Sequence, residues 1–366
     1  MIFLDHNSTT KIASEALAVM LEAYKLPLNN SSNHQLGRQA KKIVEEAREE
    51  LKKLLNAENY EVIFTGSSTE ATNTVMFGID VKKIIFSAIE HSSVYECRPQ
   101  NKEIIEIAAC ENGLIDLVDL EQKLPTDGNF LTSAMLVNNE TGAIQPVEEI
   151  SKLTHQKGGL FHCDIVQAVG KISVDLEKIN ADFVSIAAHK LNGPQGVGAL
   201  LIRKGLDIKP LIYGGKQEKS KRAGTTNIAG IAGFGAACKI AAKKILTYEN
   251  VKKLRDELEE KIKNIAGANV KIFADEVARL PNTSYIATRN CDAQTQLINF
   301  DLNKICVSAG PACSSGTSTE SRILKAMGIA PEFSTSAIRV SLAPENTRDE
   351  IEKFVEVWKN FYEKNK

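Results

Sequence analysis

The sequence lacks one-sided charge and long apolar runs, and each absence excludes a class of protein. Its 45 basic and 46 acidic residues leave a net charge of −1, so no strong field draws the chain to DNA or to an anionic membrane. The longest apolar runs are strand-sized, far short of the roughly 20 residues that span a bilayer. We therefore expect no direct DNA binding and no membrane segment. The first residues, MIFLDHNSTT, have no basic region followed by an apolar stretch, so we expect no secretion signal.

Paired cysteines are also lacking. The seven cysteines are odd in number and never spaced as C-x-x-C, so neither a disulfide framework nor a zinc site is predicted. This usage indicates a reducing, cytoplasmic compartment. Two cysteines in apolar runs, Cys163 and Cys306, are expected in the core.

What is present describes an ordinary globular protein. The chain has 366 residues, 43% hydrophobic and 25% charged, which is longer than a single hydrophobic core supports, so two domains are expected. Through the first two-thirds, strand-like runs alternate with helical patterns, and the runs read EVIFTG, KKIIFSA, FLTSAMLV, GLFHCDI and DFVSIAA. Apolar residues at three- and four-residue steps predict one helix within residues 36–55. The alternation predicts a mainly parallel sheet covered by helices.

From about Asn227 the pattern becomes one long helical stretch, followed by shorter strand and helix units. We place the domain boundary inside that stretch.

A small hydroxyl-rich turn follows the first of these strands. Gly66, Ser67 and Ser68 end the strand, and Thr69 and Glu70 start a helix. A helix N-terminus offers backbone N–H groups to an anion. A simple N-cap explains the same residues equally well.

A carboxylate and a lysine are the most informative candidate site residues in the sequence. Asp164 lies inside an apolar strand and needs a hydrogen-bonding or cationic partner, and Lys190 ends the next apolar run. The separation fits neighbouring parallel strands that open on one edge, where ligands of such sheets bind. Taken alone, the His-Lys pair is better explained by Lys190 opening a surface loop. An anion cradle, a carboxylate and a lysine amine together fit pyridoxal 5′-phosphate, held as a Schiff base.

Two further residues stand at places typical of function. His91 follows another strand; it is either a structural histidine or a flat ring that stacks on the cofactor. Cys313 lies in the run SAGPACSSG, whose small residues predict a flexible loop and an exposed thiol. An incidental surface cysteine is the alternative.

The ordered motifs resemble those of the NifS/IscS-type, or group I, cysteine desulfurases, class V aminotransferases among the fold-type I pyridoxal-phosphate enzymes. The similarity runs nearly end to end, and its motifs are FLDHNSTT, SSNHQLGRQA, TGSSTEATN, EHSSV, VNNETGAIQP, HCDIVQAVGK, HKLNGPQGVGALLIRK, KRAGTT, SAGPACSSG and AIRVSLAPENT. The resemblance implies an α/β fold with a large cofactor-binding domain, residues 14–243. A smaller α+β domain, residues 1–13 and 244–366, would carry the cysteine loop.

The resemblance also assigns residues to the cofactor ring. Lys190 forms the Schiff base and then moves the α-proton. Asp164 pairs with the pyridine nitrogen, and Gln167 approaches the phenolic oxygen. His91 stacks on the ring and takes part in proton transfer, and His189 belongs to the cofactor-binding set.

The phosphate and the substrate have their own residues in the same resemblance. Ser68 and Thr69 hold the phosphate, and Thr225 reaches it from the second subunit of a homodimer. Asn139 and Arg339 receive the carboxylate of L-cysteine, for which Arg has a matching planar fork.

The implied activity is conversion of L-cysteine to L-alanine, with sulfur transferred to Cys313 as a persulfide. That sulfur would supply iron–sulfur cluster assembly or tRNA thiolation, through an acceptor or scaffold protein. The spacing after Cys313 fits the group with a long, mobile loop.

Three departures from the family pattern stand out. Ala187 replaces a usual Ser or Thr, which removes one phosphate donor. Gln217 and Lys219 stand where many relatives carry His and Arg. The given sequence stops soon after its last expected helix, so we expect no C-terminal extension of the kind that some relatives use to grip a scaffold protein, which leaves the partner open.

Alternatives remain at this stage. The chain could be a selenocysteine lyase or another class V aminotransferase-like enzyme, although a transaminase needs no thiol such as Cys313. It could also be a weakened regulatory paralogue, for which Ala187 is the only support.

Overall fold

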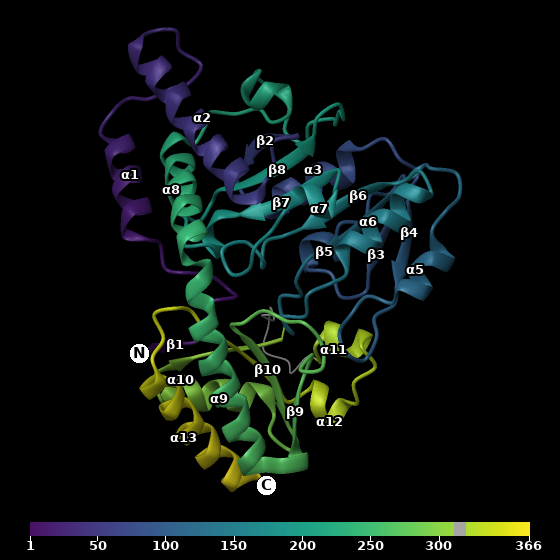
Figure 1. The fold of residues 1–366 in the computed structure, drawn as a ribbon, viewed down its shortest axis with the longest axis vertical. Helices are drawn as coiled ribbons and strands as arrows, with labels where there is room; N and C mark the ends of the chain where they lie inside the picture. Colours follow the sequence, from purple (N-terminus) through teal and green to yellow (C-terminus); the bar gives the residue numbers. More distant parts are fainter. Residues whose placement is uncertain (311–319) are drawn as a thin grey trace.

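Two sheets organise the computed structural model, which describes residues 1–310 and 320–366 (Figure 1). The larger sheet has seven strands in the order β2-β8-β7-β6-β5-β3-β4. Their bounds are β2 Tyr60–Thr65, β3 Lys83–Ser87, β4 Glu103–Ile107, β5 Phe130–Met135, β6 Leu160–Asp164, β7 Phe183–Ala187 and β8 Gly198–Arg203. Strands β4, β3, β5, β6 and β7 run parallel, and β8 is antiparallel to both β7 and β2. The predicted mainly parallel sheet is confirmed.

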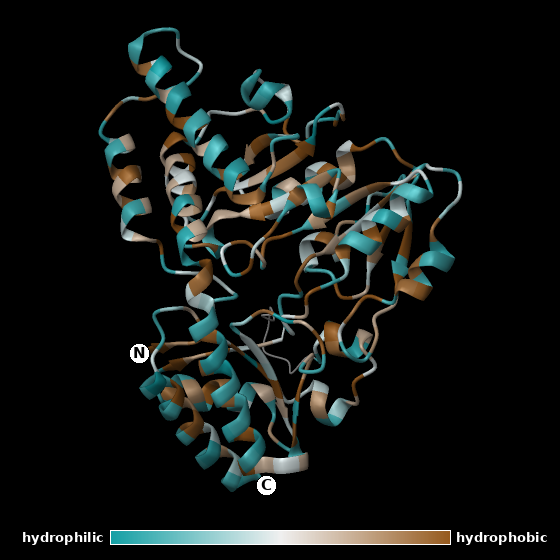
Figure 2. Ribbon diagram, viewed as in Figure 1, coloured by the Kyte–Doolittle hydropathy of each residue, from teal (hydrophilic) through white to brown (hydrophobic). Residues whose placement is uncertain are grey.

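Both faces of this sheet are buried apart from its edge strand β4, which explains why the inner strands read as continuous apolar runs. Successive side chains of a strand point to opposite faces, and Leu200 and Leu201 accordingly join different hydrophobic clusters. Helix α3 (Ser68–Gly78) covers the face of Leu200, and α2 (Gln35–Leu55), α6 (Val147–Gln156) and α8 (Ile228–Lys244) belong to the other. In Figure 2 the strands form a brown, hydrophobic band between helices with teal outer residues. The predicted helix over 36–55 is α2.

A smaller assembly lies beyond the large sheet, below it in Figure 1. It has a four-stranded antiparallel sheet, β12-β13-β10-β9, and a parallel pair, β1 with β11. Their bounds are β1 Ile2–Phe3, β9 Val270–Ile272, β10 Thr283–Thr288, β11 Ile305–Cys306, β12 Ser308–Ala309 and β13 Ala337–Ser341. Helices α9 (Tyr248–Ala266), α10 (Ala293–Leu302) and α13 (Arg348–Asn365) share a separate core with it, which includes Phe354 and Trp358.

The long helical stretch predicted from Asn227 is two helices, α8 and α9, joined by a 3₁₀ turn at Ile245–Thr247. Figure 1 shows them passing from the large sheet to the smaller assembly. Because β1 pairs with β11, the first residues of the chain pack with the last third. This pairing and the separate core support the proposed domains 14–243 and 1–13 with 244–366, whose bounds stay predictions.

The remaining helices are short or peripheral: α1 Ser14–Tyr24, α4 Ser92–Tyr95, α5 Leu117–Lys123, α7 Leu176–Ile179, α11 Arg322–Ala326 and α12 Pro331–Ser334. In residues 1–310 and 320–366, no helix is both long and apolar enough to cross a membrane.

Two local expectations need correction. Asp164 is the last residue of β6 rather than an interior one, so its carboxyl group stands at the sheet edge. Cys306 is only half-buried; it belongs to β11, a two-residue strand that pairs with the single strand β1.

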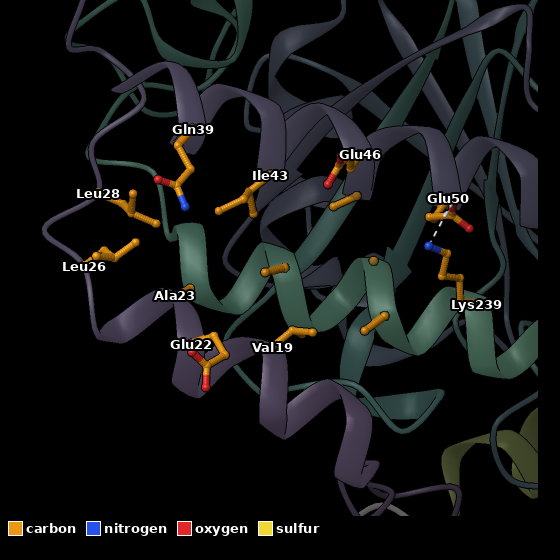
Figure 3. Close-up of a pocket in the computed structure, with 14 residues that line it drawn as sticks. Val19, Glu22, Ala23, Leu26, Leu28, Gln39, Ile43, Glu46, Glu50 and Lys239 are labelled. Carbon is orange, nitrogen blue, oxygen red and sulfur yellow. Dashed lines mark ion pairs between the residues drawn. The ribbon is translucent and has the colours of Figure 1, made fainter. Parts of the chain in front are cut away.

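A groove of about 430 Å³ lies between α1, α2 and α8 (Figure 3). Aliphatic side chains such as Leu26, Leu28 and Ile43 line it, and Lys239 of α8 pairs with Glu50 of α2 at 3.7 Å. It contains none of the predicted site residues, so the chemistry must lie elsewhere.

Candidate active site

A cavity of about 220 Å³ at the carboxyl edge of the large sheet gathers eight of the predicted residues. They are Ser68, Thr69, His91, Asn139, Asp164, Gln167, His189 and Lys190. They follow strands β2, β3, β5, β6 and β7. Residues distant in sequence meet here because parallel strands deliver their carboxyl ends to one edge.

Asp164 and Lys190 follow neighbouring strands, as their spacing predicts, since β6 and β7 pair in parallel with Asp164 opposite Ser185. The Asp164 carboxylate accepts a hydrogen bond from the Val166 N–H at 2.9 Å. Burial nevertheless raises the pKa of Asp164 to about 6. A cationic group in the cavity would hold this carboxylate in its charged form.

The Lys190 amine is held by the N-terminal segment. Its Nζ donates to the carbonyls of Asn7 and Ser8, each at 2.6 Å. Burial, and then the nearby Arg339 guanidinium, lower the pKa of Lys190 to about 8. A substantial neutral fraction therefore exists just above neutral pH, and the neutral amine is the form that attacks a carbonyl carbon.

Two histidines line the cavity in neutral form. His91 caps α4, with Nδ1 accepting from the Ser93 N–H at 3.1 Å. Burial and then the charge of Lys190 lower the pKa of His91 to about 4. The same two causes lower the pKa of His189 to about 4, and its Nδ1 lies 3.1 Å from Thr9 Oγ1. Neither ring carries charge at neutral pH, and because Nδ1 of His91 accepts a hydrogen bond, the hydrogen of this neutral ring is on Nε2.

The anion end of the cavity is the start of α3. Ser67 caps this eleven-residue helix by accepting from the Glu70 N–H at 3.1 Å, and Ser67, Ser68 and Thr69 all line the cavity. Strand β8 lies so close to this turn that a Cβ on Gly198 would be 2.8 Å from the Ser68 nitrogen. Glycine is therefore needed for this approach, which leaves the turn's N–H groups at the cavity.

Ala187 lines the same end, is 2% exposed, and offers no donor there. A hydrogen bond to a charged group contributes about 1.5–3 kcal/mol, equivalent to about 10- to 100-fold in affinity. Since the serine-rich turn already supplies donors, we expect Ala187→Ser to tighten pyridoxal phosphate binding by less than about tenfold. Titration of the apoprotein measures the change; equal or weaker affinity in the variant would mean that the cradle is already complete.

Arg339 stands beside the cavity rather than in its lining. Its Nη1 donates to the Asn139 carbonyl at 2.8 Å, and its Nη2 pairs with Asp5 Oδ1 at 2.7 Å. The Asn139 Oδ1 and Arg339 Nε atoms are buried without a hydrogen-bond partner among the described residues. The two residues predicted to receive a carboxylate are thus in contact and incompletely satisfied.

Of the described residues, Thr225 is the predicted one that lies away from this site. Thr225 is exposed and lines a different cavity, of about 210 Å³, with Thr65 and Gly66. Its reach into a second subunit stays a prediction. Cys313 lies outside the described residues.

Sequence reasoning missed several buried polar residues around the site. Glu90 is fully buried, accepts from Ser87 Oγ at 2.6 Å and from the Met135 N–H at 3.0 Å, and has its pKa raised to about 8 by burial. Glu140 accepts from Ser321 Oγ at 2.6 Å and from the Tyr285 hydroxyl at 3.0 Å. For Glu90 the available signal was a charged residue directly after the apolar run IIFSAI, similar to the signal used for Asp164. Glu140 stands in the polar stretch NNETG, where no such contrast marks it.

The donor set fits pyridoxal phosphate. One cavity holds a helix N-terminus for a phosphate, a carboxylate whose charge needs a cationic partner, and an amine with a lowered pKa. No group of three or more His, Cys, Asp or Glu side chains suited to a metal occurs in the described part of the chain. Fold and site together define a pyridoxal-phosphate enzyme of fold type I.

Comparison with known proteins places the chain within that class. The class V aminotransferase family model matches residues 2–354, and the chain belongs to this family, whose members depend on pyridoxal phosphate. It is 36% identical to cysteine desulfurase 2 of Trichormus variabilis, over 98% of this chain and 92% of the relative. It is also 36% identical to cysteine desulfurase IscS of Dictyoglomus turgidum, over 99% and 95%. The X-ray structure of a NifS-like protein from Rickettsia africae superposes with a TM-score of 0.92, at 39% identity and 99% coverage of both chains.

Proposed function

We propose that this protein is a pyridoxal-phosphate-dependent cysteine desulfurase, which converts L-cysteine to L-alanine and takes the sulfur onto Cys313. The observation that carries the proposal is the single cavity that unites Lys190, Asp164 and His91 beside Asn139 and Arg339. The full-length similarity to proteins named cysteine desulfurase supports it.

The residues have separate tasks in this reaction. When bound, the cofactor supplies an electron sink for charge that develops on the substrate. Lys190 holds the cofactor and, as a free amine of low pKa, moves the α-proton. With the cofactor bound, the carboxylate of Asp164 would keep the ring nitrogen protonated, Gln167 would contact the ring oxygen, and His91 would stack on the ring as a neutral imidazole.

Sulfur transfer requires a thiolate. The Cys313 sulfur forms an S–S bond with the substrate sulfur, the substrate Cβ–S bond breaks, and Cβ takes up a proton as alanine leaves. The enzyme thiol is thereby converted to a persulfide with no outside oxidant. Of the other cysteines, Cys97 and Cys291 have pKa values raised to about 11 by burial, and Cys163 and Cys238 are also buried. These four are poor nucleophiles, which supports Cys313 as the carrier.

Arg339→Ala should weaken substrate binding rather than cofactor binding. Removing one partner of a buried charge pair costs about 2–5 kcal/mol, so we expect at least about 30-fold more L-cysteine to be needed to change the bound cofactor's spectrum. Arg279→Ala is the matched control, because Arg279 pairs with the buried Glu259 away from the cavity. An unchanged concentration dependence in Arg339→Ala would mean that another residue takes the carboxylate.

Assembly and partners form part of the proposal. Thr225 is exposed, and so are Leu211, Ile212 and Tyr213 just before it; burial of this apolar segment against a second copy would place Thr225 at the partner's phosphate. The free cysteines fit a cytoplasmic location. The persulfide sulfur would pass to an acceptor protein for iron–sulfur cluster assembly or tRNA thiolation.

One experiment separates this function from its relatives. Holoenzyme with L-cysteine and a reductant should release equal amounts of alanine and sulfide, while alanine with a 2-oxo acid should give no transamination above background. The result that overturns the proposal is transamination without sulfide release. The same assay with selenocysteine in place of L-cysteine measures selenocysteine lyase activity for comparison.

A further inference from the structure

Lys171 is a buried lysine that the reaction described above does not use. It lies after β6, is 2% exposed, and is among the largest fully buried side chains of the protein. A buried lysine is costly unless its amine is hydrogen-bonded. Among the described residues, both hydrogen bonds of its amine go to one residue: Nζ donates to the Gln167 carbonyl at 3.1 Å and to Gln167 Oε1 at 2.8 Å.

Gln167 is therefore fixed at both ends of its carboxamide. On the other side, its Nε2 donates to the Asn7 carbonyl at 2.9 Å. Burial lowers the pKa of Lys171, but its amine carries N–H donors in either protonation state. The Asn7 carbonyl oxygen can only accept, so the group that faces it must be the amide nitrogen of Gln167. The partners thus dictate the amide orientation, with Oε1 toward Lys171 and Nε2 toward Asn7. Since an amide nitrogen has two hydrogens, one N–H is left for the cavity that Gln167 lines.

We propose that Lys171 is a positioning residue, which locks the Gln167 carboxamide so that an N–H, and not the oxygen, faces the ring oxygen of the cofactor. This inference rests on the proposed function, because it takes the cavity to hold pyridoxal phosphate. Lys171 acts through the amide and touches neither cofactor nor substrate.

The consequence is a measurable one. A hydrogen-bond donor to the ring oxygen stabilises the anionic form of that oxygen. An anionic oxygen that already accepts this bond attracts the proton on the cofactor-linked Lys190 nitrogen less strongly. The pH midpoint of the bound cofactor's visible absorbance change is thereby lowered. Other charged or titratable groups near Lys171 also affect this midpoint. They are Lys190, Arg339, His6 and His189, and the negative charge of Asp5 offsets the positive charges of Lys190 and Arg339. The variants must therefore separate orientation from charge.

Lys171→Met removes the donor and frees the amide to rotate, and we expect the midpoint to rise by about one pH unit, equivalent to ~1.4 kcal/mol. Lys171→Gln retains an uncharged N–H donor and should recover more than half of that shift. Gln167→Glu, which can still pair with Lys171 and so should fold, offers no N–H and should raise the midpoint at least as far. If Lys171 acts through Gln167, Lys171→Met adds no further shift in a Gln167→Ala background.

Lys102→Met is the matched control. Lys102 is another buried lysine, and its Nζ donates to the carbonyls of Met76 and Ile79 at the far end of α3. Its loss should leave the midpoint unchanged. The proposal is overturned by an unmoved midpoint in Lys171→Met or Gln167→Glu, by an equal shift in the control, or by a Lys171→Met shift that persists in the Gln167→Ala background. Wild-type protein that takes up no cofactor would instead overturn the proposed function.

Discussion

Lys190→Ala protein is expected to lose its visible cofactor absorbance on dialysis and to have no borohydride-reducible adduct. The reason is that Lys190 alone among the cavity residues offers an amine, with its pKa lowered to about 8. Phosphate contacts and the pairing with Asp164 would still bind the cofactor weakly, so the variant should retain reversible affinity. Lys102→Ala, which removes a buried lysine elsewhere, should keep the adduct. A reducible adduct that persists in Lys190→Ala would show that Lys190 is not the residue that binds the cofactor covalently.

The pH dependence of cofactor capture tests the same amine. Lys190 must be neutral to attack the cofactor aldehyde, and its pKa is below that of an ordinary lysine because of burial. The rate of capture by apoprotein should therefore rise from pH 6 and level off above about 8. A rate that climbs steadily to pH 10 would indicate an unperturbed lysine.

Cys313→Ser is expected to separate substrate binding from sulfur transfer. The variant should bind cofactor and change its spectrum on addition of L-cysteine, because Lys190, Asp164 and Arg339 are intact. It should form no persulfide and release sulfide only at background rate, since a serine oxygen cannot form the S–S bond.

Cys110→Ser is the control for this variant, because Cys110 is half-buried, unlike the core cysteines, and its pKa is raised by burial. It should form persulfide at the wild-type rate. Sulfide release at the wild-type rate from Cys313→Ser, or its loss in Cys110→Ser, would move the carrier role to another thiol.

The site was most predictable from the sequence where its residues stand at the ends of successive parallel strands. Asp164 and Lys190 were expected on adjacent parallel strands, and β6 and β7 are paired. Strand order fixes such neighbours, because the carboxyl ends of parallel strands share an edge.

Contacts that close over long sequence separations were not predictable in the same way. Asn7 accepts from both Gln167 and Lys190, which are 160 and 183 residues away, and no local pattern encodes that meeting. Nothing in the sequence distinguishes Lys171 from an ordinary surface lysine; its burial is seen only in the structure. The role proposed for Thr225 requires a second subunit, which a single chain does not contain.

The most direct test of the account is a single-turnover reaction of holoenzyme with L-cysteine in the absence of reductant. Alanine is quantified in the quenched mixture, and Cys313-containing peptide is examined by mass spectrometry. If Cys313 is the sulfur carrier, alanine and Cys313 persulfide form in equal amounts per active site. Alanine formed without persulfide on Cys313, or persulfide on a different cysteine, would contradict it.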